Sequence, residues 1–454
     1  MSKIFLLSSN VTVVPYPVYP LGISTITKAL NYFGHEALQF DLLSQNKSED
    51  NLIKAIIDFH PDFIGISIRN IDDVDSFSQM EGFYLDYIKC IIETIREVIT
   101  VPIILGGPAF SIIPSEILDY LKGDYGVVGE GEISLCDLIN DLSFGKIIPR
   151  IIKGISTNEI FSPVFEKDLI EFYIDQSGIL NLQTKRGCPY SCSYCTYPTL
   201  EGNRFRLKDP KYVVDNLKYL IKNYSNFDIF FTDSVFNDPA GHYLKIAEEI
   251  LKNNIKIRWT AFFRPQGMNF SDLILLKRSG LYSIEIGTDA ACDKTLMGLN
   301  KKFYFSDVIN FNELCVKAGI PSANFVMFGG PNETEDTLKE GLKNIESLKK
   351  CVVFAFSGIR IFPGTELHHI AISEGIIKKE TSLIKPVYYF SKEIEPNIMN
   401  ELIKKSFQND KTRIFPPSEG TIRMKALNLF GYKGTLWDKL ISANIIRKDR
   451  KTKR

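Results

Sequence analysis

The sequence has no uninterrupted apolar run that could cross a membrane. A transmembrane helix needs about 20 consecutive apolar residues, and no stretch of this 454-residue chain approaches that length. The first ten residues, MSKIFLLSSN, pass directly into a strand pattern without the small-residue cleavage site of a secretory signal. We therefore expect a cytoplasmic protein with no transmembrane segment.

The chain also has no excess of charge of either sign. Lysine plus arginine number 54, aspartate plus glutamate also number 54, and the formal net charge is zero. Such a chain has no overall field that attracts a polyanion, so we expect no nucleic-acid partner. Apolar residues make up 44% and charged residues 24%, which is typical of folded globular domains.

Cysteine is scarce, which excludes a disulfide framework. The eight cysteines are unevenly spaced, unlike those of disulfide-rich secreted domains. Five of them are scattered, and we expect these to be small buried apolar residues. The other three, Cys188, Cys192 and Cys195, lie within one short segment.

Strand-like apolar runs alternate with helical periodicity over residues 1–145. The strand-like runs are KIFLLSS, EALQFDLL, FIGISIRN, PIILGG and YGVVGEGE. Five strands separated by helices predict an α/β domain with a doubly wound, Rossmann-like parallel sheet. Ligands bind such sheets beyond the carboxyl ends of the strands. The residues at those ends are Ser67, Arg69, Gly106, Gly107, Gly129, Glu130, Gly131 and Glu132.

The alternation is interrupted and then resumes. Residues 146–178 do not show the alternation of strand-like and helical segments, and we expect them to form a linker. Six strand-and-helix units then fill residues 179–375, which predicts a partial (β/α)6 barrel with its site at the carboxyl ends of the strands. Residues 376–454 lack this spacing, and we expect a small, mostly helical C-terminal region with a basic tail.

The segment RGCPYSCSYC places the three clustered cysteines at C-x3-C-x2-C spacing after the first barrel strand. Three thiolates on one tight loop can hold three corners of a [4Fe-4S] cluster and leave the fourth iron open. A structural zinc site needs four ligands, and the next histidine is His242. The spacing favours the open cluster, with zinc or a purely redox cluster as the alternatives.

At these residues the sequence resembles the radical SAM superfamily, whose motif follows the first strand of a partial barrel. The resemblance implies that the open iron binds S-adenosylmethionine (SAM). A donor such as flavodoxin or ferredoxin would then supply one electron to cleave SAM into methionine and a 5′-deoxyadenosyl radical. It also implies that Tyr194 lies beside the adenine, with loop packing as the alternative.

Further strand ends supply candidate SAM contacts. Where many family members carry Gly-Gly-Glu for the methionine amino group, this chain has Thr232-Asp233-Ser234, and we expect Asp233 to substitute. Arg264 could bind the SAM carboxylate as a fork, or form a surface ion pair instead. Glu285 and Thr288 end the fourth strand, although Glu285 could instead anchor the barrel interior. Gly329 and Gly330 end the fifth strand and would let SAM approach the backbone.

A doubly wound domain ahead of this barrel resembles the cobalamin-dependent, B12-binding class of the superfamily. Ser67, Gly106-Gly107 and the run Gly129–Glu132 carry this resemblance, which implies that they bind cobalamin. The sequence lacks D-x-H-x-x-G, whose histidine is the lower ligand to cobalt in classical B12 domains. His35 and His60 are not in that context, and we expect His35 in a turn or on the surface.

Arg69 follows the third strand, facing the expected ligand crevice. A guanidinium stays charged and has no lone pair for cobalt, so Arg69 could cap the lower face without coordinating the metal. The alternative is an ion pair with Asp72 or Asp73. The loop Tyr16–Gly22 resembles the proline-rich loop near the cofactor or substrate in this class.

Together the resemblances imply a cobalamin-dependent radical SAM enzyme. We expect a C-methyltransferase, in which the radical removes hydrogen from an unactivated carbon, methylcobalamin supplies the methyl group, and a second SAM restores it. Cyclisation, ring modification and oxidation occur in the same class and stay as alternatives, as does a noncatalytic cobalamin or iron–sulfur carrier. The substrate could be a small molecule, a lipid or a peptide.

The cysteine motif predicts one cluster of about four irons per chain after anaerobic reconstitution. Changing Cys188, Cys192 or Cys195 to Ala should abolish this iron and the broad charge-transfer absorption. The matched control is Cys90→Ala, which removes a scattered cysteine and should leave both unchanged. Full iron and absorption in the three motif variants would show that the cluster assignment is wrong.

Overall fold

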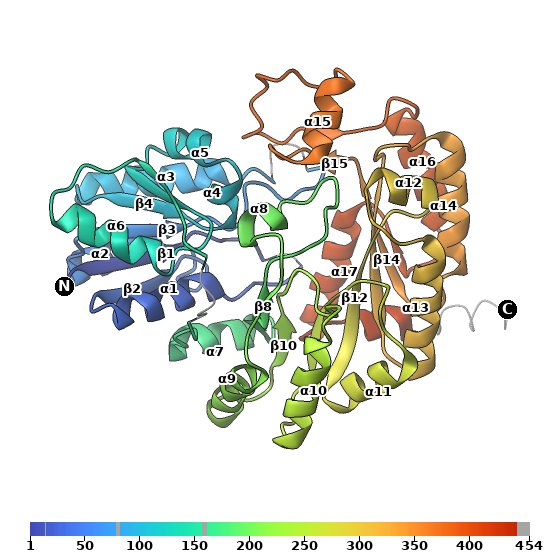
Figure 1. The fold of residues 1–454 in the computed structure, drawn as a ribbon, viewed down its shortest axis with the longest axis horizontal. Helices are drawn as coiled ribbons and strands as arrows, with labels where there is room; N and C mark the ends of the chain where they lie inside the picture. Colours follow the sequence, from blue (N-terminus) through green and yellow to red (C-terminus); the bar gives the residue numbers. More distant parts are fainter. Residues whose placement is uncertain (14, 79–81, 157–160, 443–454) are drawn as a thin grey trace.

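The computed structural model describes residues 1–442 except for 14, 79–81 and 157–160. An N-terminal α/β domain, blue to teal in Figure 1, lies next to a larger α/β domain that runs from green to red. Helix α8 (Tyr197–Glu201), which follows the cysteine motif, lies between the two domains (Figure 1). None of the described helices is long and apolar enough to cross a membrane.

The N-terminal sheet is entirely parallel, which confirms the predicted doubly wound fold. Its strands are β1 (Lys3–Ser8), β2 (Glu36–Asp41), β3 (Phe63–Ser67), β4 (Ile103–Gly106), β5 (Tyr125–Val128) and β6 (Ile151–Lys153), in the order β2-β1-β3-β4-β5-β6. The order reverses between β1 and β3. Such a switch point opens a crevice at the carboxyl ends of the strands.

Six helices cover this sheet on its two faces: α1 (Leu21–Tyr32), α2 (Glu49–Phe59), α3 (Leu85–Val98), α4 (Pro108–Ile112), α5 (Pro114–Tyr120) and α6 (Ser134–Ser143). Alternate residues of β1 enter different cores. Ile4 and Leu6 pack with residues of α1 and α6, whereas Phe5 and Leu7 pack with residues of α2 and α3. Burial on both faces explains why the strands read as continuous apolar runs.

Part of the segment expected to be a linker is structured. It supplies β6, the sixth strand of the N-terminal sheet, and α7 (Lys167–Gln176). Tyr173 of α7 is fully buried, and its hydroxyl donates to the Asp41 carboxylate at distances of 3.2 and 3.3 Å. The described parts of segment 146–178 therefore continue the N-terminal sheet and pack against it.

The second sheet contains the six parallel strands of a partial barrel. They are β7 (Ile179–Leu182), β10 (Asp228–Phe231), β11 (Trp259–Phe263), β12 (Leu281–Asp289), β13 (Ser322–Phe328) and β14 (Val352–Ser357), in sequential order. A short strand from the C-terminal region, β17 (Arg413–Ile414), extends this sheet beside β14. The barrel stays open, with β7 at one edge of the sheet and β17 at the other.

The helices of this domain that follow the barrel strands are α9 (Pro210–Asn223), α10 (His242–Lys252), α11 (Phe270–Arg278), α12 (Asp293–Gly298), α13 (Phe305–Ala318) and α14 (Glu335–Ser347). The barrel segment ends with α15 (Glu366–Ser373), and the C-terminal region adds α16 (Pro396–Phe407) and α17 (Pro417–Leu429). It also contains β16 (Tyr388–Tyr389), which pairs with β15 (Ile359–Arg360). The regular structure of this region is mostly helical, as expected, and the predicted basic tail lies outside the described residues.

A buried ion pair joins the two domains. Arg360 Nε lies 2.9 Å from Asp72 Oδ2, and the two side chains are 1% and 2% exposed. The sequence offered Asp72 as a partner for Arg69, but its carboxylate is used by Arg360 instead. Nearby, the hydroxyl of Ser76 donates to the backbone carbonyl of Ser357 across 2.6 Å. The loop after β3 is therefore tied to the barrel.

Candidate active site

The cysteine loop projects from a short hairpin between the two domains. The hairpin pairs β8 (Lys185–Arg186) with β9 (Arg206–Leu207) in antiparallel register. Gly187 follows at φ 86°, and a Cβ there would lie 2.2 Å from the Arg204 carbonyl oxygen, so only glycine fits. The Cys188 amide then donates to the Gly202 carbonyl across 3.0 Å. These contacts fix where the first cysteine leaves the hairpin.

The three thiols influence one another. Burial raises the pKa of Cys188, and it raises that of Cys195 to about 12, with a further increase from the neighbouring thiols in both cases. A bound cation is therefore needed to hold Cys188 and Cys195 as thiolates. Within the described residues, no three His, Cys, Asp or Glu side chains lie close enough together to hold a single metal ion. A cuboidal cluster instead takes one thiolate at each of three irons, and the loop fits that donor set.

Asp233 supports this loop and is not open to a ligand. It is fully buried, and its Oδ1 accepts from the amides of Thr184 (2.7 Å) and Lys185 (3.1 Å). The Thr184 hydroxyl donates to Oδ2. The structure thus contradicts the expected contact between Asp233 and the methionine amino group, because the carboxylate is used inside the protein. These contacts lie between β7, which ends at Leu182, and β8, which begins at Lys185.

Lys185 is a functional candidate that the sequence reasoning missed. Its side chain is fully buried, and Nζ lies 2.9 Å from Asp238 Oδ2 and 2.6 Å from the Phe236 carbonyl. The Asp233 carboxylate lies 3.9 Å from the same Nζ. No local pattern marks this contact, because Asp238 is 53 residues away in the sequence.

Tyr194 is tied to the end of β12. Its hydroxyl donates to Asp289 Oδ2 across 2.8 Å, and Lys301 forms an ion pair with the same oxygen. The ring is half-buried against the apolar core. The loop packing weighed for Tyr194 is therefore present, and its place beside the adenine stays a prediction.

Arg264 lies against the cysteine loop rather than on the surface. Its residue is 8% exposed, and Nη2 donates to the carbonyls of Lys301 (2.6 Å) and Lys302 (3.1 Å). Its guanidinium carbon is 4.1 Å from the ring centroid of Tyr190, which lies between Cys188 and Cys192. The surface ion pair considered as its alternative is not formed.

Glu285 lies at the inner face of β12, and Thr288 lies near the end of the same strand. Ile284 and Ile286 pack outward with residues of α11 and α13, so Glu285 between them faces the barrel interior. Burial raises the pKa of Glu285 to about 8. The Thr288 hydroxyl donates to Asn324 Oδ1 across 2.8 Å, so this side chain is used within the barrel.

Tyr16 connects this interior to the N-terminal domain. Burial raises its pKa, the Glu285 carboxylate raises it further, and the Arg69 guanidinium lowers it. Tyr16 therefore lies within electrostatic reach of one group from each domain. Its ring centroid is 6.4 Å from that of Phe230, which is 5.1 Å from that of Phe262.

Gly329 and Gly330 are enclosed by protein and do not face an open site. A Cβ at Gly329 would lie 3.1 Å from Phe390 Cδ1, and one at Gly330 would lie 3.0 Å from Ile359 Cδ1. Phe390 of the C-terminal region and Ile359 of β15 fill the space that the missing side chains leave. The structure therefore does not support the expectation that SAM approaches the backbone on the side of these two glycines where a side chain would lie.

A cavity of about 410 Å³ opens at the switch point of the N-terminal sheet. Gly106 and Gly129 leave its wall open, because a Cβ at either would meet no atom closer than 3.8 Å. Gly107 differs, since its Cβ would lie 2.7 Å from the Ile68 carbonyl at φ 92°. The sequence-predicted residues that line the cavity are Ser67, Arg69, Gly106, Gly107, Gly129, Glu130, Gly131 and Glu132.

Unpartnered polar atoms in the cavity wall fit a polar ligand. Asn10 Nδ2 and Asn181 Oδ1 have no hydrogen-bond partner among the described residues, and these two residues are 8% and 2% exposed. Buried amides normally have partners, so a ligand that supplies an acceptor and a donor would complete them. Cobalamin, which carries peripheral amides, fits this glycine-lined wall.

Arg69 extends into the cavity, but neither His35 nor His60 lines it. In the described part of the chain Arg69 has no recorded hydrogen bond or ion pair, and its side chain is exposed to the cavity. His60 ends α2 in an exposed left-handed turn. His35 follows a glycine turn as expected, but it is 7% exposed and lies outside the cavity lining, so the surface alternative is wrong.

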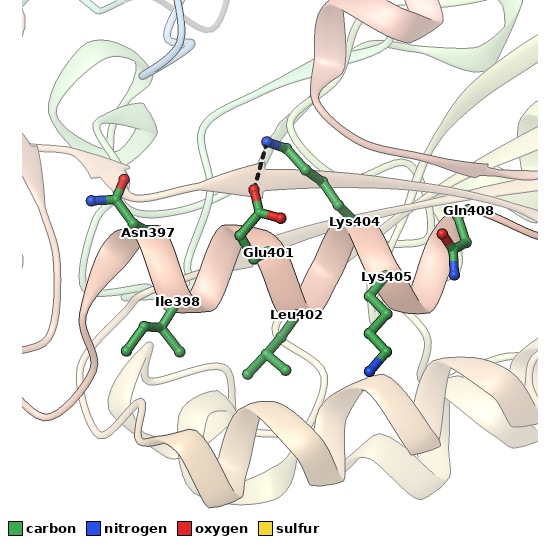
Figure 2. Close-up of a pocket in the computed structure, with 7 residues that line it drawn as sticks. All are labelled: Asn397, Ile398, Glu401, Leu402, Lys404, Lys405 and Gln408. Carbon is green, nitrogen blue, oxygen red and sulfur yellow. Dashed lines mark hydrogen bonds and ion pairs between the residues drawn. The ribbon is translucent and has the colours of Figure 1, made fainter.

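A second hollow lies on the outer face of α16, remote from these residues. Figure 2 shows its lining side chains, among them Ile398, Leu402 and Lys405, which point toward a neighbouring helix. The hollow encloses about 800 Å³ but contains none of the predicted site residues. It is a surface groove, and we do not assign the chemistry to it.

Comparison with known families identifies the class of this protein. Residues 182–345 match the profile of the radical SAM superfamily, and residues 7–139 match that of the B12 binding domain. These ranges coincide with the barrel and the switch-point sheet. The chain therefore belongs to the radical SAM enzymes that carry an N-terminal B12-binding domain.

Individual relatives are distant in sequence but close in fold. The chain is 24% identical over 431 residues to tryptophan 2-C-methyltransferase of Streptomyces laurentii, spanning 76% of this chain and 71% of the relative. TsrM of Kitasatospora setae, a methyltransferase solved with tryptophan and the SAM analogue aza-SAM, superposes with a TM-score of 0.85 at 23% identity, over 99% of this chain and 100% of TsrM. The cobalamin-dependent radical enzyme OxsB gives 0.74 at 16% identity, over 99% and 71%.

The raised pKa of Glu285 predicts a pH-dependent stability. The carboxyl group titrates near pH 4.5 in the unfolded chain and near pH 8 in the fold. Between these values only the folded state keeps the proton, so the free energy of unfolding falls as the pH rises, by up to about 1.4 kcal/mol per pH unit. Glu285→Gln, which stays neutral, should flatten this decline. Urea unfolding at pH 5, 6.5 and 8 measures it.

The matched control is Glu346→Gln, which alters an exposed carboxylate on α14. It should leave the wild-type slope unchanged. An equally steep decline in Glu285→Gln would show that Glu285 is already ionised in the folded protein at neutral pH.

Proposed function

We propose that this protein is a cobalamin-dependent radical SAM C-methyltransferase that acts on an unactivated carbon of a small molecule. The observation that carries the proposal is that both domains contribute residues to the wall of one cavity. Its lining includes the ends of β3, β4 and β5 on one side, and Tyr197 and Leu200 of α8 on the other. Because α8 begins two residues after Cys195, the cobalamin cradle and the cluster loop border one space.

The residues for each cofactor are distinct. Cys188, Cys192 and Cys195 hold a [4Fe-4S] cluster, and Gly106, Gly129 and Ser67 form the open wall for cobalamin. When bound, the cluster with SAM supplies a 5′-deoxyadenosyl radical, and cobalamin supplies a transferable methyl group. The chain's own contribution is to hold these groups about one substrate and to exclude water.

Several side chains serve this positioning. Asp289, the last residue of β12, holds Tyr194, and Arg264, which directly follows β11, holds Tyr190, so two aromatic residues of the cysteine loop are fixed from the ends of barrel strands. Glu285 is uncharged at neutral pH because of its raised pKa, so it can donate a hydrogen bond inside the barrel. Arg69 presents a permanent cation to the cavity and caps the lower face of cobalamin without coordinating the metal.

We propose a small aromatic compound as the substrate. The supporting feature is the aromatic series Tyr16, Phe230 and Phe262, which runs from the N-terminal loop to the inner face of the barrel. Phe262 is 37% exposed although it lies on a central strand, so its ring borders open space. We further propose a cytoplasmic enzyme that receives electrons from flavodoxin or ferredoxin.

The methyltransferase proposal predicts a fixed stoichiometry. One SAM generates the radical and another restores methylcobalamin, so 5′-deoxyadenosine, S-adenosylhomocysteine and methylated product should form in nearly equal amounts. The assay uses reconstituted enzyme, a reductant, SAM with a deuterated methyl group, and tryptophan as the first of a panel of small aromatic probes. After a first turnover with unlabelled methylcobalamin, the product should carry the deuterated methyl group, which mass spectrometry detects.

The other outcomes separate the alternatives. A product without a labelled methyl group, formed with deoxyadenosine alone, would identify a cyclase or an oxidative enzyme. S-adenosylhomocysteine without deoxyadenosine would identify polar methyl transfer. Cofactor binding without any SAM cleavage would identify a carrier protein.

The proposed position of Arg69 predicts cobalamin without a lower nitrogen ligand. Electron paramagnetic resonance of bound cob(II)alamin should therefore show no axial-nitrogen splitting. Arg69→His places an imidazole at the same position and should introduce that splitting, whereas His60→Ala should change nothing. Splitting in the wild-type protein would show that a nitrogen coordinates cobalt and that Arg69 does not cap the lower face. An unchanged spectrum in Arg69→His would place residue 69 away from the metal.

A further inference from the structure

Four charged side chains form a buried network between the two domains. Glu130 and Glu132 come from the loop after β5, whereas Arg186 and Arg206 come from β8 and β9. Arg186 lies 3.0 Å from Glu130 and 2.5 Å from Glu132, and Arg206 forms an ion pair with Glu130. We call these four residues the clasp. Their side chains are only 5–12% exposed.

The charges of the clasp are balanced and directionally bonded. Glu130 accepts from both arginines, and Arg206 also donates to the Glu201 carbonyl across 3.0 Å. Arg186 holds the pKa of Glu132 below its ordinary value although burial alone would raise it. Buried ion pairs contribute little net stability, but they strongly disfavour arrangements in which one member loses its partner. Such a network therefore specifies one relative placement of the two loops.

The clasp acts directly on the cluster side of the site. Arg186 is two residues before Cys188, with only the tightly enclosed Gly187 between them. The Gly187 amide donates to the Glu201 carboxylate across 3.0 Å. Because the hairpin is paired and Gly187 is tightly enclosed, Arg186 and the start of the cysteine loop move together as one unit relative to the cavity.

The clasp acts equally directly on the cavity side. Glu130 lies between Gly129 and Gly131, and all three line the cavity. The Gly129 amide donates to the Ser111 hydroxyl oxygen across 2.8 Å, and a Cβ at Gly154 would lie 2.1 Å from the Glu130 carbonyl. The loop is thus closely packed, and a shift of the Glu130 carboxylate must shift the cavity wall.

We propose that the clasp is a positioning device that sets the distance and orientation between the cobalamin cradle and the cysteine loop. This inference rests on the proposed function, because only an enzyme that uses both cofactors on one substrate needs that distance fixed. It assigns Glu130 and Glu132 to positioning through Arg186 and Arg206, whereas the sequence suggested a direct cofactor contact for Glu130.

The main test compares Glu130→Gln with a matched control. Glu130→Gln keeps the side-chain shape and removes the charge shared by both arginines. The control is Asp119→Asn, which removes the charge of an exposed ion pair with Arg150 in the same domain, where the side chains are 70% and 58% exposed. Arg206→Lys serves as a second variant, because it keeps the charge and loses the planar fork.

The first measurement is hydrogen exchange on the purified full chain without added cofactors. In Glu130→Gln, amides of residues 125–132 and 185–188 should exchange at least several-fold faster, and both segments should change together. Arg206→Lys should give a smaller change in the same two segments, and Asp119→Asn should give none. Faster exchange in only one segment, or in neither, would overturn the proposal.

The second measurement separates a reaction that needs one domain from a reaction that needs both. The probes are hydroxocobalamin, SAM and titanium(III) citrate, added to the reconstituted protein without substrate. Reductive SAM cleavage to 5′-deoxyadenosine uses the cluster side alone. Methyl transfer from SAM to cob(I)alamin uses both sides: the methyl group leaves sulfur, which keeps the bonding pair as S-adenosylhomocysteine, and cobalt is formally oxidised from +1 to +3.

In Glu130→Gln, SAM cleavage should stay within twofold of wild type, while methylcobalamin formation should fall at least tenfold. Equal loss of both reactions, together with loss of iron, would show that the clasp only supports the fold, and retention of both would show that it has no positioning role. If Glu130→Gln does not fold, Arg206→Lys decides by the same criteria. Wild-type protein that cleaves SAM but never methylates cobalamin would contradict the proposed function, and hydrogen exchange would still decide the clasp.

Discussion

The cysteine loop depends on buried charge at its root. Lys185, Asp233 and Asp238 have fully buried side chains, and removing such charges from water costs several kcal/mol each unless every group finds partners. Here they do, because Asp233 accepts from the Thr184 and Lys185 amides while Lys185 donates to Asp238 and the Phe236 carbonyl. The arrangement leaves the hairpin one position, and the three cysteines follow from it.

Parallel topology brings the two halves of the site together. In both sheets the loops that follow the strands collect at the carboxyl ends, and the cavity is lined from both domains at those ends. The domains are held there by the Asp72–Arg360 pair and by the clasp. Two cofactor domains that each fold around their own cores are thereby fixed around one space.

Residue type and strand position predicted parts of the site well and other parts poorly. The three cysteines, the open glycines Gly106 and Gly129, and the cavity position of Arg69 follow from local spacing and from the rule that strand ends gather. The contact predicted for Asp233 is not supported, because its carboxylate already accepts hydrogen bonds from the backbone amides of Thr184 and Lys185. The approach of SAM predicted for Gly329 and Gly330 is not supported either. Phe390 and Ile359, from the region beyond the fifth barrel strand, occupy the space beside these glycines. Among the scattered cysteines, four are buried as expected, whereas Cys90 is exposed on α3.

By itself the sequence determined the two parallel sheets, the order of their strands along the chain and the spacing of the three thiols. These features depend on apolar periodicity and on neighbours within a few residues. Tertiary structure alone decided which partner each charged group meets. Glu130 is 76 residues from Arg206, and Asp72 is 288 residues from Arg360. Because a buried carboxylate binds whichever donor the fold brings within about 3 Å, no local pattern contains that choice.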